Sequence, residues 1–308
     1  MLHHKEKSEE GAFLRQEDQF RSWVGKGGSP KFPVASGRYH LYVSLACPWA
    51  HRTIIVRKLK KLENVIGMTV VDPIRDERGW VFTDKKDPIN GFEYLGQAYV
   101  SSDSSYEARV TVPILWDIKT SQIVSNCDDD IMRMLNNTFD DFTDSNLDLY
   151  PVELRSEIDE INDLIYSNVN DGVYRSGFAT TQNAYEAAVH KLFETLDLLE
   201  NRLSEHRYLT GNRLTEADWR LFPTLIRFDA VYHGHFKCNL KRIIDYPNLY
   251  GYMCDLYHHD GVAETVDFDH IKRHYYMTHP EINPTKIVPV GPSFAFDASH
   301  NRAHLSNN

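Results

Sequence analysis

Cys47 has the setting of a reactive thiol, because it stands where an apolar stretch gives way to a helical pattern. Residues 39–45 are rich in β-branched, aromatic and aliphatic side chains, which is typical of a buried strand. The segment that follows begins Pro48-Trp-Ala-His-Arg52. Proline fits the first turn of a helix, where its fixed φ is suitable and its missing N–H costs no hydrogen bond. The pattern therefore predicts a strand, a helix, and Cys47 at the junction between them.

A cysteine at the start of a helix is expected to act as a nucleophile. The unpaired N–H groups and the positive end of the helix dipole stabilise an anion, which lowers a cysteine pKa from about 8.5 toward neutrality. Position 50 is alanine, so the sequence offers no resolving thiol three residues after Cys47. We therefore expect chemistry that uses one protein thiol and an external partner. The alternative is that Cys47 is one more buried, unreactive cysteine.

Composition and charge narrow the class of protein. A chain of 308 residues suggests two domains, and 42% apolar residues suffice for ordinary cores. A formal charge of −10 argues against nucleic acid as a partner, because phosphate backbones are bound by clustered Lys and Arg. The four cysteines are scattered, and the polar residues 1–10 lack the apolar core of a secretory signal. We expect a cytoplasmic protein that binds neither nucleic acid nor a membrane.

The first part of the chain predicts an α/β domain at residues 37–140, preceded by a polar extension at residues 1–36 with a linker at Gly27-Gly-Ser-Pro30. An insertion at residues 74–107 has no clean periodicity, and its length suggests an ordered segment. Pro113 stands at the head of the third strand, and a proline that opens a strand is tolerated on an edge or in a cis turn. The expected strands share an apolar, β-branched composition: residues 39–45, 65–71, 109–117 and 122–124.

Residues 141–308 predict an all-helical domain with an extended, proline-rich tail from Ile282. Thr215 and Asp218 fit a variant of the capping box, so we interpret Asp218 as a helix cap rather than as a catalytic acid. Helical spacing or helix-start signals mark five segments: residues 154–165, 184–203, 215–225, 248–256 and 260–266.

This combination resembles the glutathione transferase fold, in which an N-terminal thioredoxin-like domain is followed by an all-helical C-terminal domain. The local motifs are similar to those of the Xi class, the glutathionyl-hydroquinone reductases, over roughly residues 10–295. The motifs that carry the resemblance occur in order along the chain: Cys47-Pro-Trp-Ala-His-Arg52, Trp80-x-Phe82, Thr111-Val-Pro-Ile-Leu-Trp-Asp117, Gly172-Val-Tyr174-x-Ser-Gly-Phe-Ala179, His274-Tyr-Tyr276 and Ile282-Asn-Pro284.

The resemblance implies a reaction and a set of residues. Glutathione is the implied co-substrate, glutathionylated hydroquinones or other aromatic compounds are the implied substrates, no metal is implied, and the family forms homodimers. The implied catalytic residues are Cys47, Tyr174 and Tyr276. The residues implied in glutathione binding are Trp80, Arg109, Val112, Pro113, Cys127 and Asp128, with the Val112 backbone pairing with the cysteinyl part. The residues implied in the aromatic-substrate pocket are Trp49, Tyr174, Tyr275 and Tyr276, of which Tyr275 and Tyr276 cannot both face one pocket from a helix.

One departure from the family pattern lies at the start of the second helix. The family has a Glu-Ser pair that holds the γ-glutamyl end of glutathione, whereas this chain has Cys127-Asp128. Asp128 then brings a carboxylate toward the carboxylate of glutathione, which costs on the order of one to a few kcal/mol unless the ammonium group turns toward Asp128. The sequence therefore predicts weakened or rearranged glutathione binding.

Other interpretations remain open at this stage. Cys127 could be a second redox thiol, although the three aspartates that follow it should raise its pKa. A metal site is conceivable among six scattered histidines and cysteines, namely His233, His235, Cys238, Cys254, His258 and His259. The chain could also be an omega-like thioltransferase, or a binding protein for aromatic compounds that makes little use of glutathione. The Cys127-Asp128 substitution is the main argument for the last of these.

Overall fold

The computed structural model describes residues 6–25, 31–82, 86–293, 296, 300 and 302–307. The predicted linker Gly27-Gly-Ser-Pro30 lies outside the described residues. The chain folds as two compact units that are not continuous in sequence. The sheet unit comprises Glu17–Asp148 and Glu264–Thr278, and the helical unit comprises Met1–Gln16, Leu149–Ala263 and His279–Asn308.

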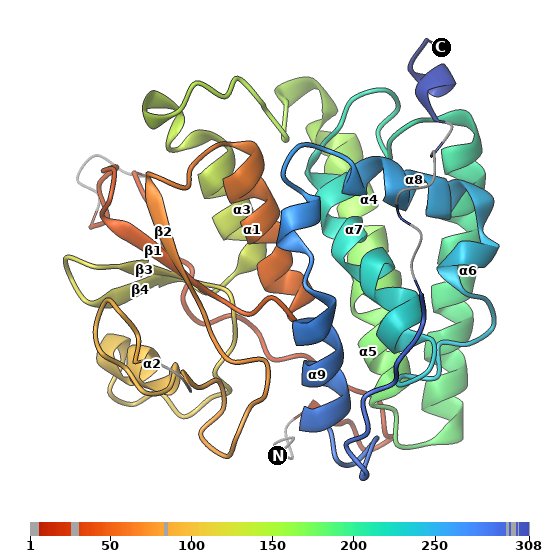
Figure 1. The fold of residues 1–308 in the computed structure, drawn as a ribbon, viewed down its shortest axis with the longest axis horizontal. Helices are drawn as coiled ribbons and strands as arrows, with labels where there is room; N and C mark the ends of the chain where they lie inside the picture. Colours follow the sequence, from red (N-terminus) through yellow and green to blue (C-terminus); the bar gives the residue numbers. More distant parts are fainter. Residues whose placement is uncertain are drawn as a thin grey trace. The chain divides into compact units, whose positions relative to one another are not determined.

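The sheet unit is built on four short strands in the order β2-β1-β3-β4. Strands β1 and β2 are parallel because α1 connects them, and β3 and β4 add antiparallel neighbours. Figure 1 shows α1 and α3 packed together on one face of this sheet. The bounds of its elements are β1 Tyr39–Val43, α1 Pro48–Leu59, β2 Ile66–Val70, α2 Gly96–Ser102, β3 Ile114–Asp117, β4 Gln122–Ser125, α3 Asp128–Asn137 and α9 Phe268–Thr278.

The order of strands and helices confirms the predicted α/β fold, with two corrections of detail. The strand predicted at residues 109–117 begins only at Ile114, because the backbone before it forms a loop with a cis peptide bond between Val112 and Pro113. The insertion at 74–107 contains α2, which the irregular sequence pattern did not predict. This helix is fastened to β4 by the Ser102 hydroxyl, which accepts a hydrogen bond from the Ile123 N–H at 2.8 Å.

The helical unit is all-helical, as predicted. α6 is its longest helix, and every residue of α7 is buried. Thr215 and Asp218 form the predicted capping box, and the buried Asp218 carboxylate also accepts hydrogen bonds from Leu209 N at 2.9 Å and Tyr252 Oη at 2.8 Å. The bounds of its helices are α4 Arg155–Ile165, α5 Gly172–Gly177, α6 Gln182–Glu205, α7 Glu216–Arg227 and α8 Pro247–Tyr257.

One predicted helix was wrong. The segment 260–266 holds only a short 3-10 turn, Ala263–Thr265, and the helix lies further on, as α9. α9 also belongs to the sheet unit rather than to the helical one, because its contacts are with that unit. The His274 ring Nδ1 lies 2.7 Å from the Pro73 carbonyl oxygen, and the ring stacks on Trp80 with centroids 4.9 Å apart.

Candidate active site

Cys47 lies at the N-terminus of α1, as predicted from Pro48. Its backbone is extended, with φ −78° and ψ 122°, and its carbonyl accepts a hydrogen bond from His51 N at 3.0 Å. The half-buried thiol donates to the Val112 carbonyl oxygen at 3.5 Å. The fold thus holds a half-buried thiol at the positive end of a helix, where an anion is stabilised.

The loop before β3 brings Val112 beside the Cys47 thiol, and its neighbours hold it in place. The Tyr99 hydroxyl, from α2, donates to the Thr111 carbonyl oxygen at 2.9 Å and accepts from the Thr111 N–H at 3.3 Å. Asn126, just before α3, donates from its amide nitrogen to the Thr111 hydroxyl at 3.2 Å. Both the insertion and the α3 start therefore fix the backbone that faces the thiol.

Arg52 joins the start of α1 to the start of α3, a role that its sequence position did not reveal. Its side chain is 1% exposed, and Nη1 donates to Asp128 Oδ2 at 2.6 Å. Its guanidinium carbon lies 4.5 Å from the ring centroid of the half-buried Trp49. A buried cation thus partly neutralises Asp128, which reduces the repulsion between Asp128 and a carboxylate ligand that the sequence predicted.

Asp18 adds a further carboxyl group at the start of α3, one that the sequence did not predict. The N-terminal arm, residues 6–25, pairs with β4 through Ser22, whose N donates to the Val124 carbonyl oxygen at 3.0 Å. This pairing brings Asp18 next to Cys127, the N-cap residue of α3, whose thiol donates to the Asp18 carboxyl. Burial and the charge of Asp128 raise the pKa of Asp18 to about 7. The contact spans more than a hundred residues, so no local spacing could have found it.

Cys127 does not have the surroundings of a second nucleophile. Burial first, and then the charge of Asp128, raise the pKa of the Cys127 thiol far above its ordinary range. A thiol that keeps its proton at neutral pH is a weak nucleophile. The structure therefore supports the prediction that the aspartates act against thiolate formation here, and it places Cys47 and Cys127 in opposite chemical settings.

Trp80 and Arg109 lie in the sheet unit, in and after the insertion. The Trp80 ring is buried, with His274 stacked on it and the Arg75 guanidinium carbon 5.3 Å from its centroid. Arg109 is half-buried, and its carbonyl oxygen accepts a hydrogen bond from the Tyr106 hydroxyl at 2.7 Å. Their roles toward glutathione stay predictions.

The two consecutive tyrosines of α9 differ in accessibility. Tyr275 is 1% exposed and packs edge-on against His274, whereas Tyr276 is half-buried. Successive residues of a helix point about 100° apart, which separates the two side chains. Burial raises the pKa of the Tyr276 hydroxyl, so Tyr276 keeps its proton at neutral pH. Of the two tyrosines, Tyr276 is therefore the more accessible, and which of them faces the substrate stays a prediction.

Tyr174 lies on α5 of the helical unit and is half-buried in an aromatic cluster. Its ring stacks with Phe13 at 6.5 Å and Phe178 at 6.2 Å between centroids, and Phe236 packs against it at 5.5 Å. The cluster leaves the ring little freedom. Its conformation is set by the N-terminal arm and by the turn after α7 together.

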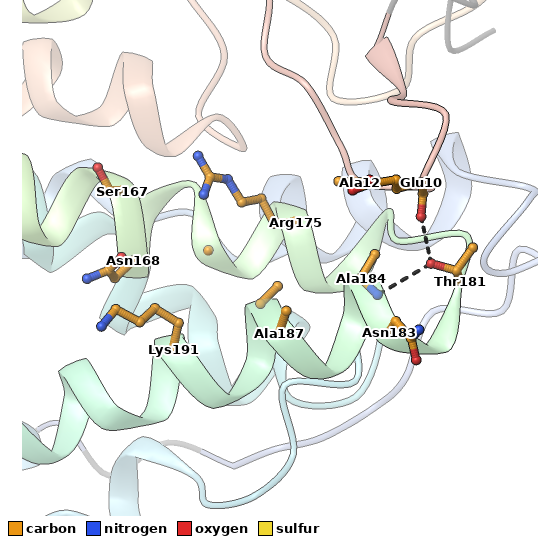
Figure 2. A pocket seen from close by; sticks show the side chains of 12 residues that line it. Glu10, Ala12, Ser167, Asn168, Arg175, Thr181, Asn183, Ala184, Ala187 and Lys191 are labelled. Atoms are coloured by element: carbon orange, nitrogen blue, oxygen red, sulfur yellow. Dashed lines mark hydrogen bonds between the residues drawn. The ribbon is translucent and has the colours of Figure 1, made fainter.

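A separate hollow of about 690 Å³ lies in the helical unit, between the arm, α5 and α6. Figure 2 shows Thr181 beside the arm, with its hydroxyl bonded to the Glu10 carbonyl oxygen at 2.8 Å. The residues that form its walls are Glu10, Ala12, Ser167, Asn168, Gly172, Arg175, Thr181, Asn183, Ala184, Ala187, Ala188 and Lys191. None of the predicted site residues is among them.

The described residues carry neither a metal-binding group nor a membrane-spanning helix. Within them, no three His, Cys, Asp or Glu side chains gather in a group that could hold a metal ion. No helix in the described ranges is both long and apolar enough to cross a membrane.

Comparison with known proteins places the chain in a family. Residues 182–253 match the family model described as Glutathione S-transferase, C-terminal domain. The glutathionyl-hydroquinone reductase PcpF of Sphingobium chlorophenolicum is 52% identical over 291 residues, which cover 93% of this chain and 92% of that relative. The chain belongs to the glutathionyl-hydroquinone reductase family. The predicted resemblance is thereby confirmed, and the chain is an enzyme of the glutathione transferase superfamily.

Solved structures of this family share the fold. The glutathione-bound structure of YqjG from Escherichia coli K-12 has a TM-score of 0.89 at 52% identity and covers 92% of this chain and 96% of its own. A Xi class glutathione transferase from Natrialba magadii has a TM-score of 0.91 at 49% identity. The match covers 92% of this chain and 89% of that one. The fold class and the Xi-class assignment are confirmed, and YqjG is a relative that holds glutathione.

Proposed function

We propose that this enzyme removes glutathione reductively from glutathionyl-hydroquinones and uses Cys47 as its nucleophile. The observation that carries the proposal is the half-buried thiol at the N-terminus of α1, with the Val112 carbonyl oxygen 3.5 Å away. The helix end favours a thiolate, and the neighbouring backbone can hold a peptide-like thiol. Membership of the glutathionyl-hydroquinone reductase family supports the substrate class.

The first half-reaction breaks the bond between sulfur and the aromatic carbon. The Cys47 thiolate attacks the sulfur of the glutathionyl group, and the electron pair of the carbon–sulfur bond goes to the aromatic carbon. That carbon takes a proton from Tyr174 or Tyr276. Tyrosine suits this role because it keeps its proton at neutral pH. The products are the hydroquinone and a disulfide between Cys47 and glutathione.

The second half-reaction restores the enzyme. The thiolate of a second glutathione attacks the glutathionyl sulfur of the mixed disulfide, which releases oxidised glutathione and the Cys47 thiolate. The proton lost by that glutathione balances the one given to the aromatic carbon. The sum is one glutathionyl-hydroquinone and one glutathione converted to one hydroquinone and one oxidised glutathione.

We assign the binding roles as follows. Trp80, Arg109 and Pro113 contact glutathione, and the Val112 backbone pairs with its cysteinyl part. The γ-glutamyl end lies at the start of α3, where backbone N–H groups donate hydrogen bonds to an anion. Its ammonium group turns toward the carboxyl groups of Asp128 and Asp18, which take the place of the family's glutamate.

Trp49, Tyr174 and Tyr276 are the side chains assigned to the aromatic part of the substrate. Tyr275 is the least accessible member of the predicted set. We further propose that the protein is cytoplasmic and forms a homodimer. Light scattering on a size-exclusion column measures the mass of the assembly, and a monomer would refute the second of these proposals.

A second candidate function is an aromatic-compound binder that makes weak use of glutathione. The crowding of Cys127, Asp128 and Asp18 at the start of α3 favours it, because two carboxyl groups and an un-ionised thiol stand where a glutathione carboxylate would bind. The pairing of Arg52 with Asp128 argues the other way. An omega-like thioltransferase would use the same Cys47 chemistry on mixed disulfides.

The deciding experiment is turnover of glutathionyl-menadiol with excess glutathione by the wild type and by Cys47→Ser, with glutathione affinity measured calorimetrically on the same samples. Cys127→Ser is the matched control, since it alters a thiol in the same unit that lacks the setting of a nucleophile. Release of menadiol that depends on Cys47 and not on Cys127 supports the reductase. Binding of menadiol without turnover favours the binding protein, and turnover only of a disulfide substrate favours the thioltransferase.

A further inference from the structure

Arg15 is a charged residue of the N-terminal arm that the proposed mechanism does not use. Its guanidinium carbon lies 4.8 Å from the ring centroid of Tyr174 and 5.4 Å from that of Phe13. Both distances are within the range of a cation–π interaction. The Arg15 side chain is 23% exposed, so most of this cation is removed from water.

Arg15 is held at this position by a buried carboxylate. Its Nε donates to Asp171 Oδ1 at 2.6 Å, and the Asp171 side chain is 4% exposed. Asp171 directly precedes α5, the helix that carries Tyr174. The other carboxylate oxygen accepts from Arg175 Nε at 2.9 Å. A planar guanidinium fixed in this way has little freedom to leave the Tyr174 ring.

The arm itself is fastened to the same part of the helical unit. Thr180 N donates to the Gly11 carbonyl oxygen at 3.0 Å, and the Thr181 hydroxyl donates to the Glu10 carbonyl oxygen (Figure 2). Gly11 has φ +85°, and a Cβ there would lie 2.7 Å from the Thr180 hydroxyl oxygen. This close approach and the positive φ both require glycine. The position of Arg15 is therefore built into the arm.

Burial opposes the positive charge of Arg15, but Asp171, Tyr174 and Tyr166 together raise the pKa of its guanidinium. The coupling is mutual, because a cation that is stabilised by a nearby phenolic oxygen also stabilises negative charge on that oxygen. Arg15 is thus a fixed cation over the ring of Tyr174, whose hydroxyl the proposed mechanism offers as a proton donor.

We propose that Arg15 is a positioning residue for Tyr174: held by Asp171, it fixes the Tyr174 ring and stabilises the negative charge that develops on the Tyr174 oxygen as its proton passes to the aromatic carbon. This inference rests on the proposed function, in which the electron pair of the broken carbon–sulfur bond accepts a tyrosine proton. The resulting phenolate regains its proton from solvent. Arg15 itself neither gains nor loses a proton.

Several other titratable and charged groups lie on the elements around Tyr174 and set the background for any pH measurement. His235 stays neutral above pH 5, because burial lowers its pKa to about 4. The titratable and charged groups on the elements that pack around Tyr174 are Arg15, Asp171, Arg175, Tyr166, Tyr232, His235 and His279.

Two measurements test the proposal. The first is a double-mutant cycle on glutathionyl-menadiol turnover with Arg15→Met, Tyr174→Phe and the pair. We expect Arg15→Met to lower kcat about threefold to tenfold, and to have less than about a twofold effect once Tyr174 is phenylalanine. Arg175→Met is the matched control, because it removes the other partner of Asp171. A loss that persists in the Tyr174→Phe background would overturn the proposal.

The second measurement does not depend on turnover. Fluorine NMR of protein labelled with fluorotyrosine, with the Tyr174 signal assigned by its loss in Tyr174→Phe, gives the pH at which this hydroxyl titrates. We expect Arg15→Met to raise that midpoint by about half a pH unit or more, and Arg15→Lys to restore most of it. An unchanged midpoint overturns the proposal whether or not the enzyme turns over. Absence of Cys47-dependent turnover refutes the proposed function instead.

Discussion

Asp18 gives the sharpest test of the electrostatics at the candidate glutathione site. Its carboxyl group has a pKa of about 7, because burial and the charges of Asp128 and Asp129 oppose its ionisation. In the unfolded chain it ionises near its ordinary value of 3.8. A raised pKa in the folded state means that the protein loses stability as the pH rises from about 4 to about 7 and is then constant.

The size of this loss follows from the rise in pKa. At about 1.4 kcal/mol per pH unit, the upper limit is about 4 kcal/mol. Asp18 is partly exposed, so solvent screening reduces the expected loss to about 1–2 kcal/mol. Asp18→Asn is neutral at every pH, and its amide oxygen can still accept a hydrogen bond from Cys127. We therefore expect Asp18→Asn to stabilise the protein, and to do so more at pH 8 than at pH 5.

Urea unfolding followed by tryptophan fluorescence at pH 5 and pH 8 measures this difference. Asp144→Asn is the matched control, because it removes an exposed carboxylate from the same unit. The control should shift the urea midpoint by a similar, small amount at both values. An equal gain for Asp18→Asn at both pH values would refute the reasoning, since it would mean that Asp18 ionises alike in the folded and unfolded states.

Three further predictions concern binding and packing. Cys127→Glu with Asp128→Ser should tighten glutathione binding about tenfold by calorimetry; unchanged affinity would contradict the proposed conflict at the α3 start. Gly177→Ala should lower the free energy of unfolding, measured in urea, by about 1–3 kcal/mol, because its Cβ would lie 2.2 Å from the buried Phe236 ring. Gly172→Ala should leave it unchanged, because the nearest atom to its Cβ would lie 3.8 Å away, and an equal loss for both variants would contradict this. Asp218→Ala should cost about 3–5 kcal/mol in urea unfolding, because it leaves three buried donors unpaired, and a loss under 1 kcal/mol would contradict this.

Much of the fold could be predicted because its signals are local. Pro48 after an apolar stretch fixes where α1 begins, through its fixed φ, and Thr215 with Asp218 fixes where α7 begins, through hydrogen bonds within one turn. α9 was misplaced because the segment before it has competing turn residues. Its place in the sheet unit depends on a contact between His274 and Trp80, which no period in the sequence encodes.

The candidate site likewise combines features that the sequence predicted with features that only the structure revealed. The sequence by itself determined that Cys47 is a helix-start thiol and that Cys127-Asp128 departs from the family pattern, because both follow from neighbouring residues. Only the tertiary structure decided that Arg52 pairs with Asp128, that Asp18 contacts Cys127, and that Arg15 lies over the Tyr174 ring. Charge and burial act through space, so they depend on which distant segments the fold brings together. The sequence therefore predicted the nucleophile, whereas tertiary packing decided which charged side chains surround the candidate site.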